Sequence, residues 1–198
     1  MKRKIEFGCL LSMTIALLSF IALWLFGQGV IKLSNQTYSV EYRPDLGIPT
    51  RVDWILTDSF LGRTKRTPTM RFKADSRTPR PRVTSALYTR SGYQRGHMCP
   101  AADRSVSKEL MGQTFVMSNV CPMTPALNTG AWKRTEEETR ALARQGRRVN
   151  VTAAPLFFPR DTSWIGGHRV AVPHAFAKFV WSADSPQVYK CWIIENEF

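Results

Sequence analysis

One long helix set among many strand-like runs is the feature that most constrains the fold of this chain. Residues 129–145 are rich in Glu, Arg and Ala, which favours a helix, and Gly146 is a natural stop. A short helical turn is predicted at residues 107–111. Short apolar or alternating runs are typical of strands, and they occur at residues 37–42, 52–56, 114–120, 148–152, 170–173, 177–181 and 188–194. Because there is no internal repeat and no second boundary, we expect one globular domain with an N-terminal extension.

The extension, residues 1–33, differs from the rest in composition. Lys2-Arg3-Lys4 precedes an apolar run at residues 7–26, the order found in export signals and N-terminal membrane anchors. A run of about twenty residues can span a bilayer and is longer than a usual cleaved signal. We therefore expect an exported domain over residues 34–198, either anchored outside the cytoplasm by an uncleaved segment or, after cleavage of a signal peptide, secreted or periplasmic.

The charge of the chain points to a polyanionic partner. The formal net charge is +13, and residues 1–31 hold only three basic residues and one acidic residue, so +11 remains on the domain. Such an excess favours nucleic acid first and an anionic membrane surface second. Ten of the basic residues and one acidic residue, Asp75, lie between positions 60 and 95. We interpret residues 62–82 as an irregular basic loop over the substrate path, with a solvated loop that binds nothing as the alternative.

The segment Arg95-Gly96-His97 contains the only histidine among the first 167 residues. Imidazole has the side-chain pKa nearest neutrality, which suits it to general base catalysis. On a strand, Arg95 and His97 would share a face, and a base beside a cation suits an anionic substrate such as a phosphodiester. A structural histidine in a turn is the alternative for His97.

A second group of polar residues recurs every four positions along the predicted helix and its N-terminal approach. Asn128, Trp132, Glu136 and Arg140 would line one face of that helix. The alternative is an ordinary amphipathic helix in which Trp132 is in the core, Glu136 and Arg140 form a surface pair, and Asn128 is an N-cap.

Other common chemistries lack their motifs in this sequence. There is no glycine-rich phosphate loop, dinucleotide fingerprint or Gly-x-Ser-x-Gly elbow. The only close pair of zinc-type ligands is His97 and Cys99, which disfavours a zinc site. In an oxidising compartment, Cys99, Cys121 and Cys191 permit one disulfide. A bridge between Cys99 and Cys121 would brace the ends of two neighbouring strands, and buried free thiols are the alternative.

Taken together, the motifs resemble the DNA/RNA non-specific endonuclease family, the ββα-metal or endonuclease G-like nucleases. The resemblance rests on Arg-Gly-His, on Ser118-Asn119 about twenty residues later, and on Asn128-x-Gly130-x-Trp132-x-x-x-Glu136. It extends from about Tyr38 to the C-terminus. It implies an α+β fold with a central, mainly antiparallel sheet flanked by helices. It also implies metal-dependent hydrolysis of single- or double-stranded DNA and RNA with little sequence preference, leaving 5′-phosphate and 3′-hydroxyl ends.

The same resemblance implies roles for the base and the metal ligands. His97 would deprotonate the attacking water. Asn128 would bind one Mg²⁺ directly, with Mn²⁺ or another divalent cation able to substitute, and Glu136 would hold the metal-bound waters. One neutral oxygen ligand and an outer carboxylate are adequate for Mg²⁺, which is a hard cation that keeps most of its water.

The arginines and one further asparagine receive roles in the same way, and one position departs from the family pattern. Arg95 and Arg140 would contact the scissile phosphate, and Asn119 would orient the substrate or the site. The family usually has Asp-Arg-Gly-His, whereas this chain has Gln94 in place of the aspartate, and Leu87 stands where an acidic residue is common. Gln94 can donate and accept hydrogen bonds but carries no charge, so any charge-dependent role of that aspartate is in question.

We therefore expect an exported, magnesium-dependent endonuclease. A catalytically impaired surface nucleic-acid-binding protein is the alternative, suggested by Gln94 and the net charge. A structural membrane protein with a lipid-facing basic surface would leave the motifs unexplained. The sequence leaves the oligomeric state open, a homodimer included, and identifies no protein inhibitor.

Overall fold

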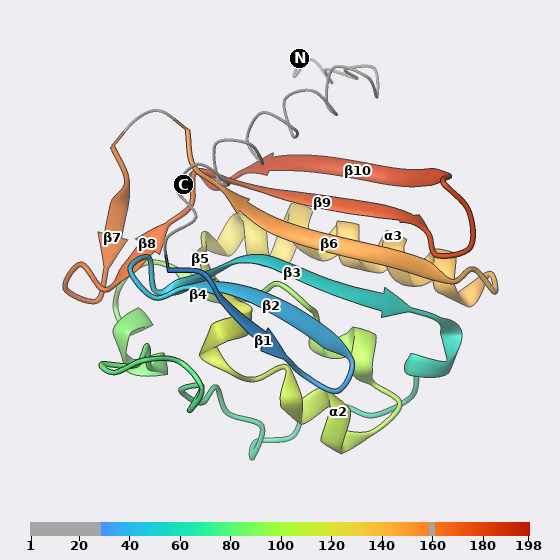
Figure 1. Ribbon diagram of the computed structural model, residues 1–198, viewed down its shortest axis with the longest axis horizontal. Helices are drawn as coiled ribbons and strands as arrows, with labels where there is room; N and C mark the ends of the chain where they lie inside the picture. Colours follow the sequence, from blue (N-terminus) through green and yellow to red (C-terminus); the bar gives the residue numbers. More distant parts are fainter. Residues whose placement is uncertain (1–28, 159–160) are drawn as a thin grey trace. The chain divides into compact units, whose positions relative to one another are not determined.

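A six-stranded sheet with strand order β1-β2-β3-β6-β9-β10 forms the centre of the domain (Figure 1). This computed structural model describes residues 29–158 and 161–198, and its main compact unit is Ile31–Phe198. Every neighbouring pair in the sheet is antiparallel, as expected. The strands are β1 (Ile31–Ser34), β2 (Tyr38–Arg43), β3 (Ile48–Leu56), β6 (Val149–Leu156), β9 (Ala175–Ser182) and β10 (Val188–Glu195).

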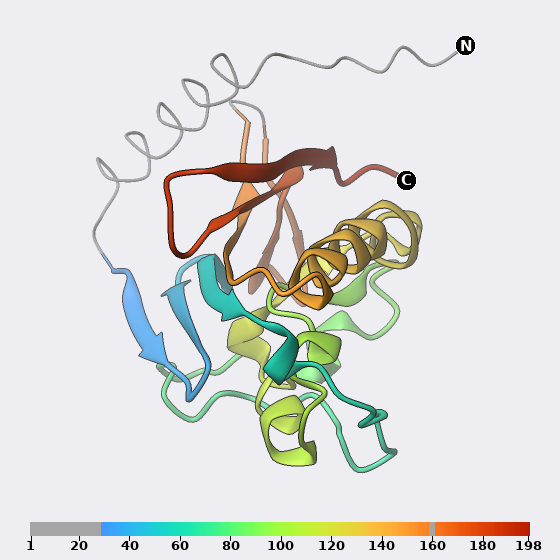
Figure 2. The same ribbon diagram turned by 90° about the vertical axis from the view of Figure 1, so that its right-hand side faces the viewer.

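The period-two pattern of β3 shows why one face of this sheet is buried. Val52, Trp54 and Leu56 are buried, while the residues between them are partly or fully exposed. Helix α3 (Trp132–Arg144) lies along one face of the sheet (Figures 1 and 2). Trp132 is fully buried there, with its ring 5.6 Å from that of Phe176 on β9. The long helix therefore packs on the sheet through the tryptophan of the motif.

A smaller unit precedes this helix and completes a ββα arrangement. Strand β4 (Gln94–His97) pairs antiparallel with β5 (Val120–Met123), and α2 (Lys108–Gln113) lies in the connection between them. A two-stranded sheet of β7 (Ser163–Ile165) and β8 (Val170–Val172) follows α3 and β6 in the chain. Gly96 on β4 has no room for a side chain, because a Cβ atom there would lie 2.3 Å from the sulfur of Met123. A larger residue at this position of Arg-Gly-His would therefore force the Met123 side chain to move.

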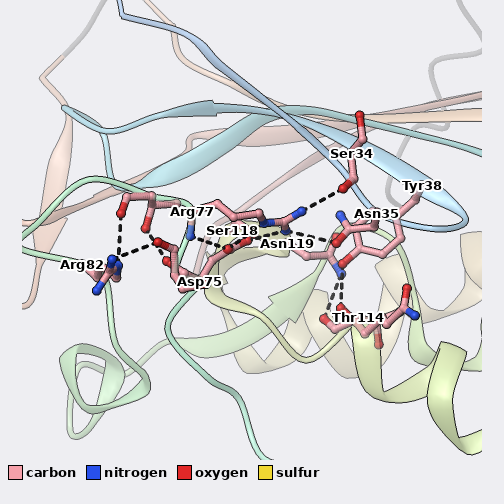
Figure 3. A network of polar contacts seen from close by, with 12 residues as sticks. Ser34, Asn35, Tyr38, Asp75, Arg77, Arg82, Thr114, Ser118 and Asn119 are labelled. Atoms are coloured by element: carbon pink, nitrogen blue, oxygen red, sulfur yellow. Dashed lines mark hydrogen bonds and ion pairs between the residues drawn. The ribbon is translucent and has the colours of Figure 1, made fainter.

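Specific contacts hold the basic loop, residues 62–82, although its path is irregular. Lys73 forms an isolated parallel bridge with Val116. Buried Asp75 accepts hydrogen bonds from Arg77 and Ser118, and Arg77 also donates to the Ser34 carbonyl, as Figure 3 shows. Burial opposes ionisation of Asp75, but these hydrogen bonds hold its pKa below the ordinary value. Two anchor points therefore fix the middle of the loop against β1 and the segment before β5.

Two of the predicted elements are wrong in position. Residues 114–120 form no continuous strand, because a 3₁₀ turn at Met117–Asn119 precedes β5. There the Asn119 side chain donates to the Thr114 carbonyl and replaces ladder hydrogen bonding (Figure 3). The helical path also begins before residue 129, because a π-helical turn at Leu127–Ala131 leads directly into α3. The other predicted strands and the predicted turn at residues 107–111 are confirmed to within four residues at their ends.

The N-terminal extension falls almost entirely outside the described residues. Strand β1 begins at Ile31, so the last three residues assigned to the extension belong to the sheet. In the described part of the chain, no helix has the length and apolar character needed to cross a membrane.

Candidate functional site

His97 ends β4, and two other elements hold its backbone. The indole Nε1 of Trp132 on α3 donates to the His97 carbonyl at 3.1 Å. The Asn119 carbonyl accepts from the Met98 amide at 2.9 Å, and its Oδ1 accepts from the Cys99 amide at 2.9 Å. Asn119 is fully buried and also donates to the Cys99 carbonyl. Asn119 therefore fixes the backbone of the two residues that follow His97.

The His97 ring lies between two phenylalanines. Its centroid is 4.9 Å from that of Phe72 in the basic loop and 4.8 Å from that of Phe115. Arg66 lies over the Phe115 ring at 5.0 Å. Burial, reinforced by the charge of Arg66, lowers the pKa of His97 to about 4. His97 is partly exposed as a residue, but its Nε2 is buried and has no hydrogen-bond partner among the described residues. The imidazole is therefore neutral near pH 7 and able to accept a proton.

Replacing Phe72 by alanine is expected to raise the pKa of His97 toward 6.5, because water would reach the ring and stabilise the imidazolium. The pKa can be followed by NMR titration, since the chain has only three histidines. Phe157→Ala is the matched control, because Phe157 lies 6.0 Å from His174 and should leave His97 unchanged. A His97 pKa near 6.5 in the wild type, or an equal pKa in wild type and Phe72→Ala, would contradict the role assigned to the phenylalanines.

Asn128 lies in the π-helical turn between β5 and α3. Such turns are rare and are often found at functional sites. The Asn128 backbone amide donates to the Thr124 carbonyl at 2.9 Å, and its side-chain Nδ2 donates to Oε1 of Gln94 at 2.7 Å. No described residue donates a hydrogen bond to Oδ1 of Asn128, and the residue is partly exposed. Asn128 therefore presents a carboxamide oxygen that is available to a ligand.

Glu136 lies two helical turns beyond Asn128 and borders a buried cluster of charges. Its side chain is 16% exposed, and its Oε2 is 3.8 Å from Arg140. Burial raises the pKa of Glu136, whereas the nearby ammonium of Lys178 opposes that rise. Burial likewise lowers the pKa of Lys178, whose fully buried amine lies 4.0 Å from the Trp132 ring centroid. The cluster thus holds a mostly buried acid, Glu136, next to the cations Lys178 and Arg140.

Arg140 belongs to the inner part of this cluster. Its guanidinium forms a 2.9 Å ion pair with Asp103, and the two side chains are only 10% and 1% exposed. Asp103 also accepts from the Trp54 indole at 3.0 Å. The predicted contact of Arg140 with a scissile phosphate is not supported by this placement, because the guanidinium is buried and already paired. A structural ion pair that joins α3 to the 3₁₀ turn Ala101–Arg104 describes it better.

Arg95 shares strand β4 with His97, and its side chain points to the 3₁₀ turn Ser85–Tyr88. It donates to the Ser85 carbonyl at 2.6 Å, and its guanidinium carbon lies 5.6 Å from the Tyr88 ring centroid. Its Nε is buried and has no hydrogen-bond partner in the described part of the chain. The Nε–H group of Arg95 is therefore still able to donate a hydrogen bond to a ligand.

The donor set fits a hard cation better than zinc. No group of three or more His, Cys, Asp or Glu side chains that could hold a metal occurs within residues 29–158 and 161–198. Instead, one carboxamide oxygen of Asn128 and one partly exposed carboxylate of Glu136 lie along the same helix. Mg²⁺ keeps several of its waters and is commonly bound by few protein oxygens, so these residues fit such an ion.

The predicted disulfide is absent. Cys99 and Cys121 are both free thiols and are completely buried in the core. Burial raises the pKa of both thiols, to about 12 for Cys99. The site is braced by the hydrogen bonds of Asn119 and Trp132 instead.

Three residues of the site were not singled out by sequence: Arg66, Phe72 and Phe115. The basic composition of residues 62–82 indicated the loop, but nothing in its pattern showed which residue reaches His97. The contacts depend on Lys73, which bonds through its backbone to Phe115 and Met117 and so places the two aromatic rings side by side. That pairing between distant segments has no local sequence signal.

The hydrogen bond between Trp132 and His97 predicts a measurable effect on stability. Trp132→Phe should lower the free energy of unfolding by about 1 kcal/mol, because the partly buried His97 carbonyl loses its donor. Urea unfolding measures the change. Trp181→Phe is the control, because Trp181 alternates to the opposite face of β9 from Lys178. Equal stability of the two variants would show that the indole hydrogen bond contributes nothing.

Known proteins resemble this chain in sequence and in fold. Residues 25–197 match the model of a family described as DNA/RNA non-specific endonuclease. A protein named nuclease from Nostoc sp. is 35% identical over 161 residues, which cover 79% of this chain and 56% of the relative. Mitochondrial endonuclease G of Homo sapiens is 38% identical over 117 residues, covering 54% of this chain and 39% of the relative. The chain therefore spans about half, or less, of the length of these curated relatives.

A crystal structure described as the EndoG/EndoGI complex, a study of EndoG inhibition, matches with a TM-score of 0.74. The match has 28% identity and covers 84% of this chain and 74% of the other. It confirms the predicted α+β fold with a central, mainly antiparallel sheet.

The comparisons contradict the predicted export. Relatives from Homo sapiens, Danio rerio, Saccharomyces cerevisiae and Schizosaccharomyces pombe are named as mitochondrial nucleases. The basic and apolar pattern of residues 1–33 was the sole basis for export, and such a pattern does not by itself specify one destination. The family match, the two curated relatives and the fold agree with the motifs around His97 and Asn128: the chain belongs to the DNA/RNA non-specific endonuclease family.

Proposed function

We propose that this protein is a divalent-cation-dependent endonuclease that hydrolyses phosphodiester bonds in DNA and RNA with little sequence preference. The observation that carries the proposal is the double link between β4 and the helix that follows β5. Trp132 binds the His97 carbonyl, and Gln94 binds the Asn128 side chain. These two contacts tie the strand that carries His97 to the helical segment that carries Asn128 and Trp132, which supports a shared site.

In this proposal His97 is the general base. Its phenylalanine neighbours and Arg66 keep the imidazole neutral, and a neutral imidazole can take a proton from an attacking water. The imidazolium would then release this proton to bulk water, which restores the neutral ring for the next turnover. Asn119 and Trp132 act on the backbone of His97 and so limit the positions that the ring can adopt.

Asn128 Oδ1 and the Glu136 carboxylate would hold the cation, the first directly and the second through water. When bound, Mg²⁺ supplies Lewis-acid stabilisation of charge on the phosphate and on the leaving oxygen. Arg95 on the strand of His97, and Arg66 over the neighbouring Phe115 ring, would bind phosphate oxygens, since the guanidinium of Arg140 is committed to Asp103. Contacts to phosphate carry little base information, which agrees with weak sequence preference.

The test is a cleavage assay on the full chain. Supercoiled plasmid and a single-stranded RNA are incubated with protein and Mg²⁺, with EDTA in a parallel reaction. We expect nicking of the plasmid and degradation of the RNA only with the cation present. Retardation of DNA without cleavage would favour the alternative of a catalytically impaired nucleic-acid-binding protein and would refute the proposal.

A further inference from the structure

Gln94 occupies the one position at which the catalytic strand departs from the family motif, and it contacts the proposed metal ligand. It is the first residue of β4 and lies opposite Met123 on β5. Its Oε1 accepts the 2.7 Å hydrogen bond from Asn128 Nδ2. In the described part of the chain, no other side chain hydrogen-bonds to the Asn128 carboxamide. Gln94 is therefore the group that sets the orientation of this amide.

Orientation matters because a carboxamide has an acceptor end and a donor end. A cation can bind Oδ1 of Asn128 but is repelled by the partly positive Nδ2 hydrogens. When Gln94 accepts from Nδ2, Oδ1 is left for the cation. The contact therefore favours the orientation that binds a metal.

A glutamine can enforce this orientation less strictly than a carboxylate. Its own amide can turn so that its NH₂ group donates to Asn128 Oδ1, and Asn128 Nδ2 then faces the cation position. An ionised carboxylate accepts only, so it permits a single arrangement. A hydrogen bond to a charged acceptor is also about twice as strong as one between neutral groups. The neutral pair thus has two arrangements, of which one is unable to bind the ion.

We infer that Gln94 is a positioning residue that sets which end of the Asn128 amide faces the divalent cation, and that its neutral side chain makes cation binding weaker than a carboxylate of the same shape would. The inference rests on the proposed function, because it takes Asn128 as the direct ligand. It predicts that the wild type needs a higher concentration of divalent cation for half-saturation of the site than the Gln94→Glu variant does. The substitution of Asp by Gln then tunes metal affinity and does not abolish the site.

The experiment measures Mn²⁺ binding to the full-length protein without nucleic acid, by the loss of the free-ion EPR signal and by calorimetry. Gln94→Glu keeps the length of the side chain and removes the donor end, so we expect about 5- to 10-fold tighter binding. Gln94→Leu removes the acceptor, and we expect about 10-fold weaker binding. Melting temperatures without metal show whether each variant folds.

Thr129→Glu is the matched control for charge. Thr129 is exposed and adjacent to Asn128 in the chain, and its hydroxyl donates to the Pro125 carbonyl, so it adds a carboxylate nearby without touching the Asn128 amide. We expect a smaller gain in Mn²⁺ affinity than from Gln94→Glu. An equal gain from both, or unchanged affinity in a folded Gln94→Leu variant, would overturn the positioning role.

A nicking assay on the same samples separates this inference from the proposed function. If the wild type binds Mn²⁺ and nicks plasmid while the Gln94 variants do not change the affinity, only the inference fails. If the wild type neither binds the ion nor nicks plasmid, the proposed function fails, and the inference fails with it.

Discussion

His97→Ala is expected to lower the rate of plasmid nicking by about 10²–10⁴-fold, the usual contribution of a positioned general base. The expectation follows from the site, where the ring of His97 is held neutral between Phe72 and Phe115. Initial rates of conversion of supercoiled to nicked plasmid at saturating Mg²⁺ measure the effect. Retarded mobility of the DNA should persist, because the basic residues of the loop at 62–82 are unchanged.

Two controls make this result specific. His97→Gln preserves much of the volume between the two phenylalanines, so a loss of activity in both variants cannot come from a cavity alone. His168→Asn changes a histidine outside the site, where the positive φ of 60° favours asparagine among the non-glycine residues. The His168 variant should nick plasmid at the wild-type rate. Wild-type activity in both folded His97 variants would refute the assignment of the general base.

Asn128→Ala is expected to reduce nicking by about 100-fold or more, because it removes the proposed ligand oxygen. We also expect Mg²⁺ to raise the melting temperature of the wild type and not that of Asn128→Ala, since a ligand stabilises only the state that binds it. Asn128→Asp retains an oxygen at the same position and should keep a measurable part of both effects. Asn150→Ala on β6 is the control, because this residue lies outside the π-helical turn and its side chain donates a long, 3.4 Å hydrogen bond to the Ser182 carbonyl.

A clear result against this assignment would be a Mg²⁺-dependent stabilisation of Asn128→Ala equal to that of the wild type. The ion would then bind elsewhere, and Glu136 would be the next residue to replace. The stabilisation measurement does not depend on cleavage, so it remains informative even if the variant is inactive for another reason.

Several local features followed from the sequence because their causes are local. Alternation at residues 52–56 predicts a strand with one buried face, and β3 has that pattern. Composition and Gly146 predict the end of the long helix, and α3 ends at Arg144. The strand predicted at 114–120 fails because Met117, Ser118 and Asn119 form a buried 3₁₀ turn inside the apolar run, and burial alone does not distinguish a turn from a strand.

The charged residues show the limit of reading along one helix face. Spacing correctly placed Glu136 and Arg140 as neighbours, at 3.8 Å. It could not show that Arg140 would pair with Asp103, 37 residues earlier in the chain, and that the guanidinium would be buried as a result. Arg140, four residues after Glu136, could face either the substrate or the core. Only the packing of α3 on the sheet decides which of these two directions its side chain takes.

The sequence by itself determined the family, the residue types of the site and the order in which they occur, because motif spacing within one strand or one helix is a local property. The tertiary structure alone decided what surrounds each of those residues. It placed Phe72, Phe115 and Arg66 around His97, and it set Gln94 against Asn128. The physical reason is that desolvation and the orientation of an amide depend on atoms from distant segments. The pKa of His97 and the availability of the Asn128 oxygen therefore arise only when β4, β5, α3 and the basic loop pack together.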